Sequence, residues 1–410
     1  MSVSEPLVYN PFAPGYTDDP YPTYARFRDA DPVHHSPLGV WLLFRHQDVT
    51  RFLREPGLSV EDRNAHDTPL TDVVVDTLGE REQRGEHAMI NRDPPDHTRL
   101  RRLVSKAFTP RMVQRFRDRV QELVDRSLDA AADRGGMELI DDYAFPLPFQ
   151  VITDMLGLPD TGVDVDEIRD LSGRLVSSLE PVVDPDRIRA TREAGNRMVE
   201  LIAEAVEVKR RQPADDLLSG LILAEEDGDV LSTGELIDQV VLLYVAGHET
   251  TVNLVGNGLR ALLLDPSGPE QLARLRADGS LVENAVDELL RFDSPVQMTR
   301  RITLREVEVD GRTLEPGAFV SLVLASANRD PAVFGPTADS LDLGRAEAAQ
   351  HVSFGGGHHY CLGASLARLE AQVALGSLVA RFERIEPLAD PTWNGRINLR
   401  GLQRLPLNLA

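Results

Sequence analysis

The sequence FGGGHHYCLG at residues 354–363 contains Cys361, the only cysteine among the 410 residues. A lone cysteine cannot form an intramolecular disulfide, and a glycine-rich turn before a helix is an unusual place for an inert core thiol. Gly355 and Gly357 can take positive φ angles, which lets the chain fold tightly below the sulfur. Because a nearby helix N-terminus stabilises a thiolate, the segment indicates one thiolate held rigidly against a large, flat ligand.

Three interpretations of this segment are open from the residues alone. Zinc is one, since His351, His358 and His359 accompany Cys361, but a structural zinc site usually has four ligands in two paired spacings. An inert buried cysteine is the second. The third, which we favour, is a thiolate bound to haem iron, where the sulfur donates electron density that promotes O–O cleavage.

A second motif, AGHETT at residues 246–251, lies midway along the clearest expected helix, which covers about residues 232–264. A capping box starts this helix, and the apolar run 240–246 predicts a buried middle. A glycine followed by an acid and two hydroxyls suggests a local distortion, in which a hydroxyl replaces a backbone bond. Glu249 and Thr250 then become candidate proton carriers. Alone, the hexapeptide also fits a threonine bonded to its own turn and a solvated glutamate.

Together, the two motifs resemble those of the cytochrome P450 family. The residues 246–251 are similar to the oxygen-binding groove of that family. The resemblance extends over nearly the whole chain, from Pro20 to Leu409, and implies heme b (iron protoporphyrin IX) as the cofactor. The haem-binding signature of the family has six fixed positions, and the chain matches all of them, at Phe354, Gly355, Gly357, His359, Cys361 and Gly363.

The resemblance also implies roles for individual side chains. Cys361 is expected to be the axial ligand of the haem iron. Thr250 is expected to hydrogen-bond dioxygen, and Glu249 to help deliver protons. The expected cofactor-binding residues are Phe354, Gly355, Gly363 and Ala246 around the haem, with His97, Arg101, Arg301 and His359 at its propionates.

Glu288 and Arg291 stand three residues apart on one expected helix face. In the family that the chain resembles, this pair is a buried structural ion pair that supports the cysteine segment. Its third partner is usually a downstream arginine. Arg329 is one candidate, and Ser340 stands near the place where an arginine is expected.

We expect one domain, residues 1–410, with a short polar leader over about residues 1–18. The resemblance implies a mainly α structure with a minor β region, in the triangular-prism cytochrome P450 fold, with the haem between the long central helix and the cysteine-loop helix. The local patterns agree with that architecture. They predict helices over about 20–30, 94–224, 283–292 and 362–382, strands over 39–44, 307–311 and 318–323, and a long loop over 61–90.

The composition bears on partners and location. A formal net charge of −22 disfavours nucleic acid, because phosphate binding requires a basic surface. The longest apolar run, 240–246, is far shorter than the ~20 residues that span a bilayer, so no membrane partner is expected. One cysteine and the lack of a signal-peptide pattern favour the cytoplasm, and the acidic surface favours a monomer.

The resemblance implies a ferredoxin and a ferredoxin reductase as electron donors, since no flavin domain is present in the sequence. Five basic residues stand out on an otherwise acidic chain. They form either a docking patch for an acidic ferredoxin or a set of scattered, solvated bases. These residues are Arg99, Arg102, Lys106, Arg111 and Arg368.

The implied function is a monooxygenase that uses dioxygen, two electrons and two protons to hydroxylate or epoxidise a medium-sized apolar molecule. A natural-product intermediate of secondary metabolism is the first expectation, and a steroid or foreign compound the second. Alternatives are oxidative coupling, desaturation or peroxide use, and a haem-binding sensor; the intact Glu249–Thr250 pair argues against peroxide use and a sensor. The expected pocket draws on residues 61–90 and 174–189, on Leu242 and Val245, on Val296 and Gln297 within 295–298, and on Leu399 within 399–402.

Overall fold

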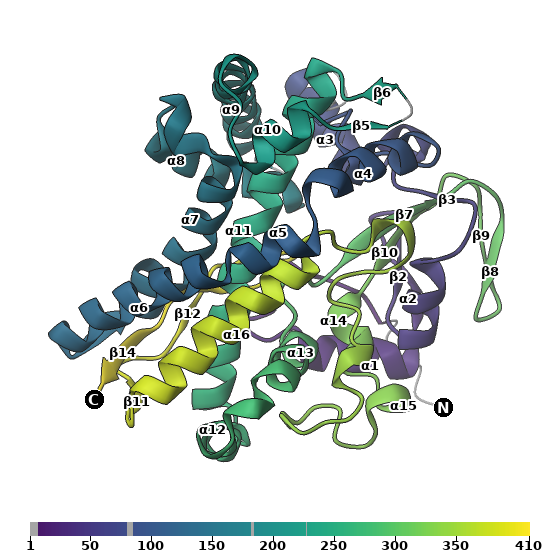
Figure 1. Ribbon diagram of the computed structural model, residues 1–410. Helices are drawn as coiled ribbons and strands as arrows, with labels where there is room; N and C mark the ends of the chain where they lie inside the picture. Colours follow the sequence, from purple (N-terminus) through teal and green to yellow (C-terminus); the bar gives the residue numbers. More distant parts are fainter. Residues whose placement is uncertain (1–6, 80–84, 182–183, 227) are drawn as a thin grey trace, which may run out of the picture.

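The longest helix, α11 (Thr233–Leu264), has 32 residues and forms the axis of the molecule. Its start follows the capping box in the sequence: the Ser232 hydroxyl accepts a hydrogen bond from the Glu235 amide, and the Glu235 carboxylate accepts one from the Ser232 amide. At about 1.5 Å per residue the helix spans roughly 48 Å. The computed structural model describes residues 7–79, 85–181, 184–226 and 228–410 (Figure 1).

Helices make up most of the chain, as the sequence predicts. Helix α11 packs against α7, α9, α12, α13 and α16, so the core forms around it. No helix in the described part of the chain is both long and apolar enough to cross a membrane. Besides α11, the helices are α1 (Tyr21–Ala30), α2 (His46–Phe52), α3 (Pro69–Leu78), α4 (Asp96–Ala107), α5 (Pro110–Arg115), α6 (Arg117–Arg134), α7 (Pro146–Leu156), α8 (Val165–Leu175), α9 (Pro185–Arg211), α10 (Leu217–Ile222), α12 (Gly268–Ala277), α13 (Val282–Phe292), α14 (Leu324–Ala327), α15 (Pro331–Phe334) and α16 (Ala364–Arg381).

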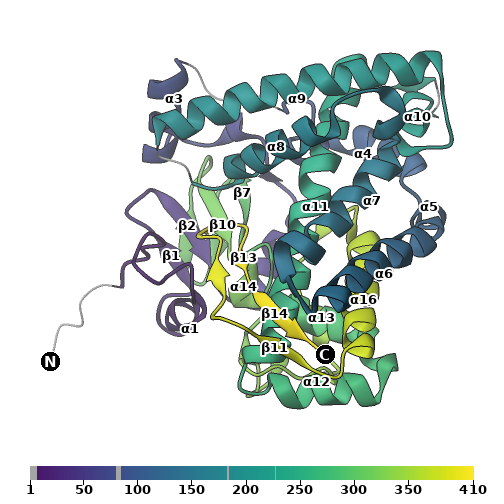
Figure 2. The same cartoon turned by 90° about the vertical axis from the view of Figure 1, so that its left-hand side faces the viewer.

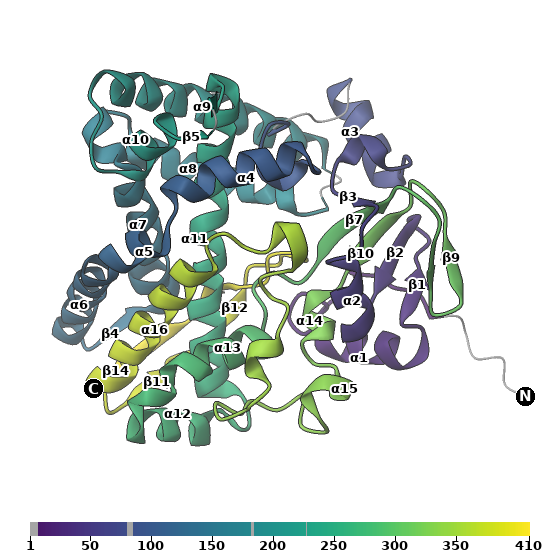
Figure 3. The same cartoon turned by 45° about the vertical axis from the view of Figure 1, so that its right-hand side comes forward.

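The strands form a minor region beside the helices, and α9 lies across one end of α11 (Figure 2, Figure 3). The main sheet has the order β1-β2-β10-β7-β3, with β10 parallel to β2 and antiparallel to β7. In this sheet, Arg301 of β7 lies opposite Val320 of β10. The strands are β1 (Val33–His35), β2 (Val40–Leu43), β3 (Leu58–Ser59), β4 (Gly136–Glu138), β5 (Glu225–Glu226), β6 (Asp229–Val230), β7 (Thr299–Thr303), β8 (Val307–Val309), β9 (Arg312–Leu314), β10 (Phe319–Leu322), β11 (Ile385–Pro387), β12 (Thr392–Trp393), β13 (Leu402–Arg404) and β14 (Pro406–Leu409).

The segment 61–90, expected to be one long loop, is partly helical. It contains α3, which packs against α9. Three consecutive valines argue against a helix in the sequence, because β-branched residues are poor helix formers. Thr68 compensates by accepting a hydrogen bond from the Thr71 amide, and Pro69 occupies the first turn. Residues 80–84 lie outside the described residues.

The polar leader expected over residues 1–18 is a packed part of the fold where the structure describes it, from residue 7 onwards. Tyr9 and Tyr16 are buried, and their hydroxyl oxygens lie 2.5 Å apart. The Tyr16 hydroxyl donates to that of Tyr24 in α1 at 3.0 Å. These tyrosines are separated by prolines, glycines and acids, so no periodic pattern marks their packing in the sequence. Residues 1–6 lie outside the described residues.

Glu288 and Arg291 of α13 form a completely buried ion pair, with 2.7 Å between Arg291 Nε and Glu288 Oε2. The third partner is Arg345, whose Nε lies 3.1 Å from Glu288 Oε1. It is not Arg329, the candidate from the sequence, whose guanidinium donates to a backbone carbonyl at the end of α13. Ser340 takes part through its carbonyl oxygen, which accepts from Arg291 and Arg345. The arginine therefore follows a few residues after the place where it was expected.

Candidate active site

The cysteine segment folds as a tight turn that presents Cys361 ahead of α16. Gly355 and Gly357 adopt left-handed φ angles of 69° and 66°, which confirms the expectation from the sequence. A Cβ atom on Gly357 would also collide with the carbonyl oxygen of Leu53. The Cys361 amide donates to the Phe354 carbonyl at 3.0 Å, which closes the turn. Only glycine meets both demands at position 357.

The sulfur of Cys361 lies where backbone amides point. The amides of Gly363 and Ala364, at the start of α16, donate toward Sγ. Burial nevertheless raises the pKa of the Cys361 thiol, and these amides together with Arg101 and Arg368 oppose the rise only in part. The low-pKa thiolate expected from the sequence is therefore not a property of the protein alone. Metal binding displaces a thiol proton, so Cys361 would bind iron as a thiolate.

The four basic side chains expected at the haem propionates come together from three parts of the chain. His97 and Arg101 are on α4, Arg301 is on β7, and His359 is in the cysteine segment. The ring centroids of His97 and His359 lie 4.2 Å apart. Arg301 and Arg101 are both close enough to His359 to lower its pKa. The fold thus brings together side chains that lie up to more than 250 positions apart in the sequence, from His97 to His359.

The pKa shifts of this group reveal a shortage of negative charge. Burial, with Arg101 nearby, lowers the pKa of His97 to about 4. Burial, with His97 and Arg301 nearby, lowers the pKa of His359 to about 3. Burial also lowers the pKa of Arg301 to about 10. His97 is 2% exposed, and neither of its ring nitrogens has a hydrogen-bond partner in the described part of the chain.

A haem fits this shortage, because it carries two propionates that require cationic or hydrogen-bonding partners. The unpartnered ring of His97 is a buried polar group of the kind that is costly to leave unbonded. Among the described residues, no group of three or more His, Cys, Asp or Glu side chains is arranged to hold a metal ion, so the ligand set that zinc requires is not found there. Cys361 would hold the iron, and His97, Arg101, Arg301 and His359 would hold the propionates.

The middle of α11 has a buried face and an open face. Tyr244 and His248 are completely buried, whereas Ala246 between them is exposed, although α11 runs through the interior of the molecule (Figure 2). The expectation of a middle that is buried all round is therefore wrong, because one face stays at least partly exposed. Residues that share this open face by helical spacing are Leu242, Val245, Ala246, Glu249 and Thr250, and all are at least partly exposed.

Glu249 and Thr250 make different contacts on the open face. The Thr250 hydroxyl donates to the Ala246 carbonyl at 3.0 Å. Helix α11 is continuous across this point, so the expected distortion amounts to a side-chain bond within an unbroken helix. The Glu249 carboxylate forms an ion pair with Arg396. His248, on the buried face, has Nδ1 2.9 Å from a backbone carbonyl oxygen of its own helix.

The remaining predicted pocket residues divide into two groups. Val296 and Leu399 form an isolated β-bridge, and Leu399 is 4% exposed. Gln297 belongs to the core instead of the pocket, since it is 1% exposed. Its Oε1 accepts from the Tyr24 hydroxyl at 3.0 Å, and its amide nitrogen donates to the Ser294 carbonyl at 2.6 Å. In the predicted pocket segments, residues 80–84 and 182–183 lie outside the described residues.

The sequence analysis did not single out two charged side chains that contact α11. Arg396 reaches Glu249 from 147 positions away along the chain. Glu370 of α16 is 1% exposed and contacts the Thr251 hydroxyl, and burial raises its pKa to about 8. A signal for Glu370 exists, because it stands four residues after Leu366 on an apolar helix stripe. No local pattern marks Arg396.

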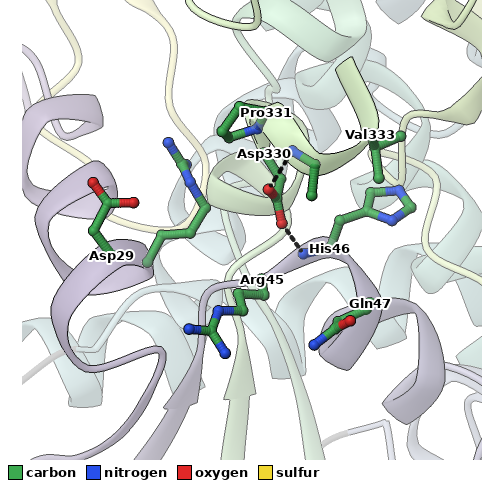
Figure 4. A pocket seen from close by; sticks show the side chains of 9 residues that line it. Asp29, Arg45, His46, Gln47, Asp330, Pro331 and Val333 are labelled. Atoms are coloured by element: carbon green, nitrogen blue, oxygen red, sulfur yellow. Dashed lines mark hydrogen bonds between the residues drawn. The ribbon is translucent and has the colours of Figure 1, made fainter. Parts of the chain in front are cut away.

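A surface hollow beside α2 and α15 contains none of these residues (Figure 4). The Asp330 carboxylate accepts from the His46 amide at 2.9 Å and from the Ala332 amide at 3.0 Å. It therefore fixes the starts of both short helices. The hollow is a joint between helices, lined by Arg28, Asp29, Arg45, His46, Gln47, Asp330, Pro331, Ala332 and Val333.

The chain is similar to known proteins over nearly its whole length. The family model described as Cytochrome P450 matches residues 72–394. Cytochrome P450 107B1 of Saccharopolyspora erythraea is 42% identical over 412 residues, which cover 97% of this chain and 96% of that protein. The 6-deoxyerythronolide B hydroxylase of the same organism is 36% identical over 404 residues, with 95% and 96% covered.

The fold is likewise shared with solved structures. The cytochrome P450 PksS of the Bacillus subtilis bacillaene polyketide synthase matches with a TM-score of 0.87 and 33% identity, covering 98% of this chain and all of that one. This match confirms the expected fold class, mainly α with a minor β region. The family match, the relatives and the shared fold agree, and the chain therefore belongs to the cytochrome P450 family.

Proposed function

We propose that this cytochrome P450 hydroxylates or epoxidises a medium-sized, apolar, polyketide-type intermediate. As a member of the family, the chain is a haem-thiolate monooxygenase that acts on a small molecule with dioxygen. Two relatives support the substrate class: one is named for hydroxylating 6-deoxyerythronolide B, and the other belongs to a bacillaene polyketide synthase. The expected steroid or foreign compound remains the alternative substrate.

The open face of α11 is the observation that carries the proposal. Its first part is apolar, with Leu242 and Val245, and its second part carries Glu249 and Thr250. From Leu242 to Thr250 the face extends about 12 Å along the helix. Apolar side chains and proton carriers therefore lie on one and the same exposed face of the helix. Such a face suits an apolar substrate, with a few polar groups placed at the reacting end.

Haem, when bound, supplies the chemistry of dioxygen activation, and a thiolate ligand favours O–O cleavage. Cys361 would hold the iron through Sγ. The group of His97, Arg101, Arg301 and His359 would bind the propionates. Phe354, Gly355 and Gly363 would border the haem, as the resemblance implies. These assignments follow the unpartnered His97 ring and the turn that presents Cys361.

Glu249 and Thr250 would carry protons at the open face. Thr250 holds a proton at Oγ1, which now lies in a hydrogen bond to the Ala246 carbonyl. Glu249 can exchange a proton at its carboxylate, because its ion pair with Arg396 engages Oε1. A carboxyl and a hydroxyl on consecutive residues of the open face provide two groups that can pass protons there. Peroxide use would not require this path, so the pair favours the monooxygenase reaction over that alternative.

We also propose a ferredoxin and its reductase as electron donors to a cytoplasmic monomer. The five basic residues named for docking are not equivalent. Arg99 pairs with Asp229 and Glu235, and Arg368 pairs with Asp287. Arg102, Lys106 and Arg111 on α4 and α5 are the exposed members of the group, and docking would fall to them because a partner protein can reach them. Turnover that does not weaken with rising salt would count against a charge-steered donor.

A binding screen on the haem-loaded protein tests the substrate class. Macrolactones, linear polyketide mimics, steroids and fatty acids are added, and the shift of the haem spin state is recorded. We expect macrolactones to bind most tightly and the product to take one oxygen atom from labelled dioxygen. Tighter binding of steroids would overturn the substrate class, and a product without the label would overturn hydroxylation and epoxidation.

The proton carriers are tested by the ratio of product formed to reductant consumed. Thr250→Ala and Glu249→Gln should each lower this ratio several-fold while the reductant is still consumed. Thr191→Ala is a matched control, because Thr191 also donates to the carbonyl four residues before it, at 2.8 Å, but in α9. An unchanged ratio in Thr250→Ala or Glu249→Gln would remove that residue from the proton path.

A further inference from the structure

Arg396 is the one cation that the structure pairs with Glu249, and it comes from a surface loop. The loop joins β12 to β13, and we call its residues 394–400 the strap. Gly395 has a φ angle of 69°, and the Arg396 amide donates to the Asn394 side-chain oxygen at 3.1 Å. This turn projects Arg396 toward α11. The side chains of Arg396 and Glu249 are 24% and 13% exposed, so the pair is only partly shielded from water.

The strap is fastened at its other side by Glu180. One carboxylate oxygen, Oε2, accepts from the amides of Ile397 and Asn398 at 2.7 and 2.9 Å. The other, Oε1, accepts from the Leu399 amide at 2.9 Å. Asn398 adds a bond from its side-chain nitrogen to the Leu179 carbonyl at 2.6 Å. A carboxylate that receives three successive backbone amides is a strong and directional anchor.

Glu180 belongs to a part of the chain distinct from both the strap and α11. It follows the turn Val176–Leu179 at the end of α8 and precedes α9, which lies across α11 (Figure 2). Among the described residues, four hydrogen bonds join the α8–α9 connection to the strap. The strap contacts α11 through the Arg396–Glu249 ion pair and through the Asn257 side-chain amide, which donates to the Arg400 carbonyl at 3.1 Å. The α8–α9 connection and the proposed proton carrier are linked through a single loop.

The rear of the strap is held independently of Glu180. The Arg400 guanidinium donates to Asp293 at 3.0 Å and to the carbonyl of Asp18 at 2.8 Å. The Gln297 amide donates to the Asn398 carbonyl at 2.8 Å. Loss of Glu180 would therefore loosen the front of the strap, where Arg396 sits, and leave the strap attached to the core.

We propose that Arg396 is a positioning residue for Glu249, and that Glu180 sets the position of Arg396 by clamping the strap. The inference rests on the proposed role of Glu249 in proton transfer. Arg396 binds Oε1 of Glu249 and so leaves Oε2 for proton exchange. With the Glu180 carboxylate in place, the strap is fixed and Glu249 is oriented. Without that carboxylate, the three amides would lose their acceptor and the position of Arg396 would no longer be fixed.

The test combines coupling, the ratio of product to reductant consumed, with amide hydrogen exchange in the haem-loaded enzyme. Arg396→Gln should lower coupling about three- to ten-fold, and Arg396→Lys, which keeps the charge, should retain most of it. In a Glu249→Gln background, Arg396→Gln should cause no further loss. Asp186→Asn is the matched control, because Asp186 is an exposed acid near Glu180 that pairs with Arg189 and does not touch the strap.

Glu180→Ala should raise amide exchange at residues 397–399 at least ten-fold and lower coupling in the same direction as Arg396→Gln. The double variant should be no worse than Arg396→Gln alone, because both changes act on one carboxylate. Asp186→Asn should change neither quantity.

Three results would overturn the inference. One is unchanged coupling in Arg396→Gln while Glu249→Gln is uncoupled, which leaves the proton role of Glu249 standing. Another is faster exchange in Glu180→Ala with full coupling, which reduces the clamp to a structural contact. The third is a loss of coupling in the Glu180→Ala, Arg396→Gln double variant that equals the product of the two single losses. Full coupling in Glu249→Gln, by contrast, would refute the proposed proton role itself.

Discussion

Two glutamate–arginine pairs, one within α13 and one between α11 and the strap, differ in almost every physical respect. Glu288 and Arg291 lie on one helix, and both side chains are 0% exposed. The arginine also donates to three backbone carbonyls, at Asn328, Ala338 and Ser340. Glu249 and Arg396 join a helix to a loop, and both side chains remain in partial contact with water.

The difference separates a scaffold from an adjustable contact. A buried pair with every polar atom bonded cannot lose one partner without leaving a charge in the core. A partly exposed pair exchanges its partner for water at little cost. The pair at α13 therefore belongs to the buried scaffold, whereas the pair at α11 can be separated at little cost. The following changes probe this contrast, from the largest expected effect to the smallest.

Glu288→Gln should have the largest effect on folding. Arg291 and Arg345 would then share a buried site without a negative charge, and removal of one partner from a buried pair costs about 3–5 kcal/mol. Chemical denaturation measures the loss. Arg274→Gln is the control, because it breaks a pair with Asp342 whose side chains are 41% and 46% exposed. Equal stability losses in the two variants would erase the distinction between buried and exposed pairs.

Glu370 extends the comparison to a buried carboxyl without an arginine. Burial raises its pKa to about 8, and the Thr251 hydroxyl opposes this only in part. Between the ordinary value near 4.5 and about 8, the folded state keeps a proton that the unfolded state has lost. The free energy of unfolding therefore falls as pH rises, by up to about 1.4 kcal/mol per pH unit from this group.

Glu370→Gln removes this slope, because an amide does not ionise. Melting temperatures are measured at pH 5, 6, 7 and 8. The melting temperature of the variant should rise relative to that of the natural chain at each step. A constant difference across this range would mean that Glu370 is ionised in the fold or titrates outside it.

His97 is the converse case, a buried base without an acid. His97→Leu should stabilise the haem-free chain by about 1 kcal/mol, since it removes unbonded polar atoms from the core. The same change should speed haem loss several-fold, because a propionate loses its partner. Denaturation of the haem-free protein and transfer of haem to an acceptor protein measure the two effects. Equal haem retention in the variant would show that His97 does not bind the cofactor.

Arg396→Gln should have the smallest effect on folding, about 0–1 kcal/mol, as for other partly exposed pairs. Its effect on coupling is expected to be several-fold. Arg396→Gln should therefore lower coupling with little loss of stability. At Glu288, by contrast, a loss of activity would follow the loss of folded protein. A stability loss above about 3 kcal/mol in Arg396→Gln would place this pair with the scaffold.

The sequence predicts the elements around the site well, because local signals encode them. The glycines of the cysteine segment anticipate its positive φ angles, and the capping box marks the start of α11. The contacts between distant segments are not encoded locally. Arg345 replaces the candidate Arg329, and Arg396 meets Glu249 across 147 positions. The sequence did not predict helix α3, because packing against α9 and a threonine cap outweigh the low helix propensity of its valines.

The most direct test of the site is the absorption spectrum of the reduced, carbon-monoxide-bound protein. The natural chain should show the red-shifted band of a thiolate-ligated haem. Cys361→His keeps a ligand for the iron and should bind haem without this band. A haem-loaded natural protein that lacks the band, or a Cys361→His variant that retains it, would contradict the assignment of Cys361 as the iron ligand.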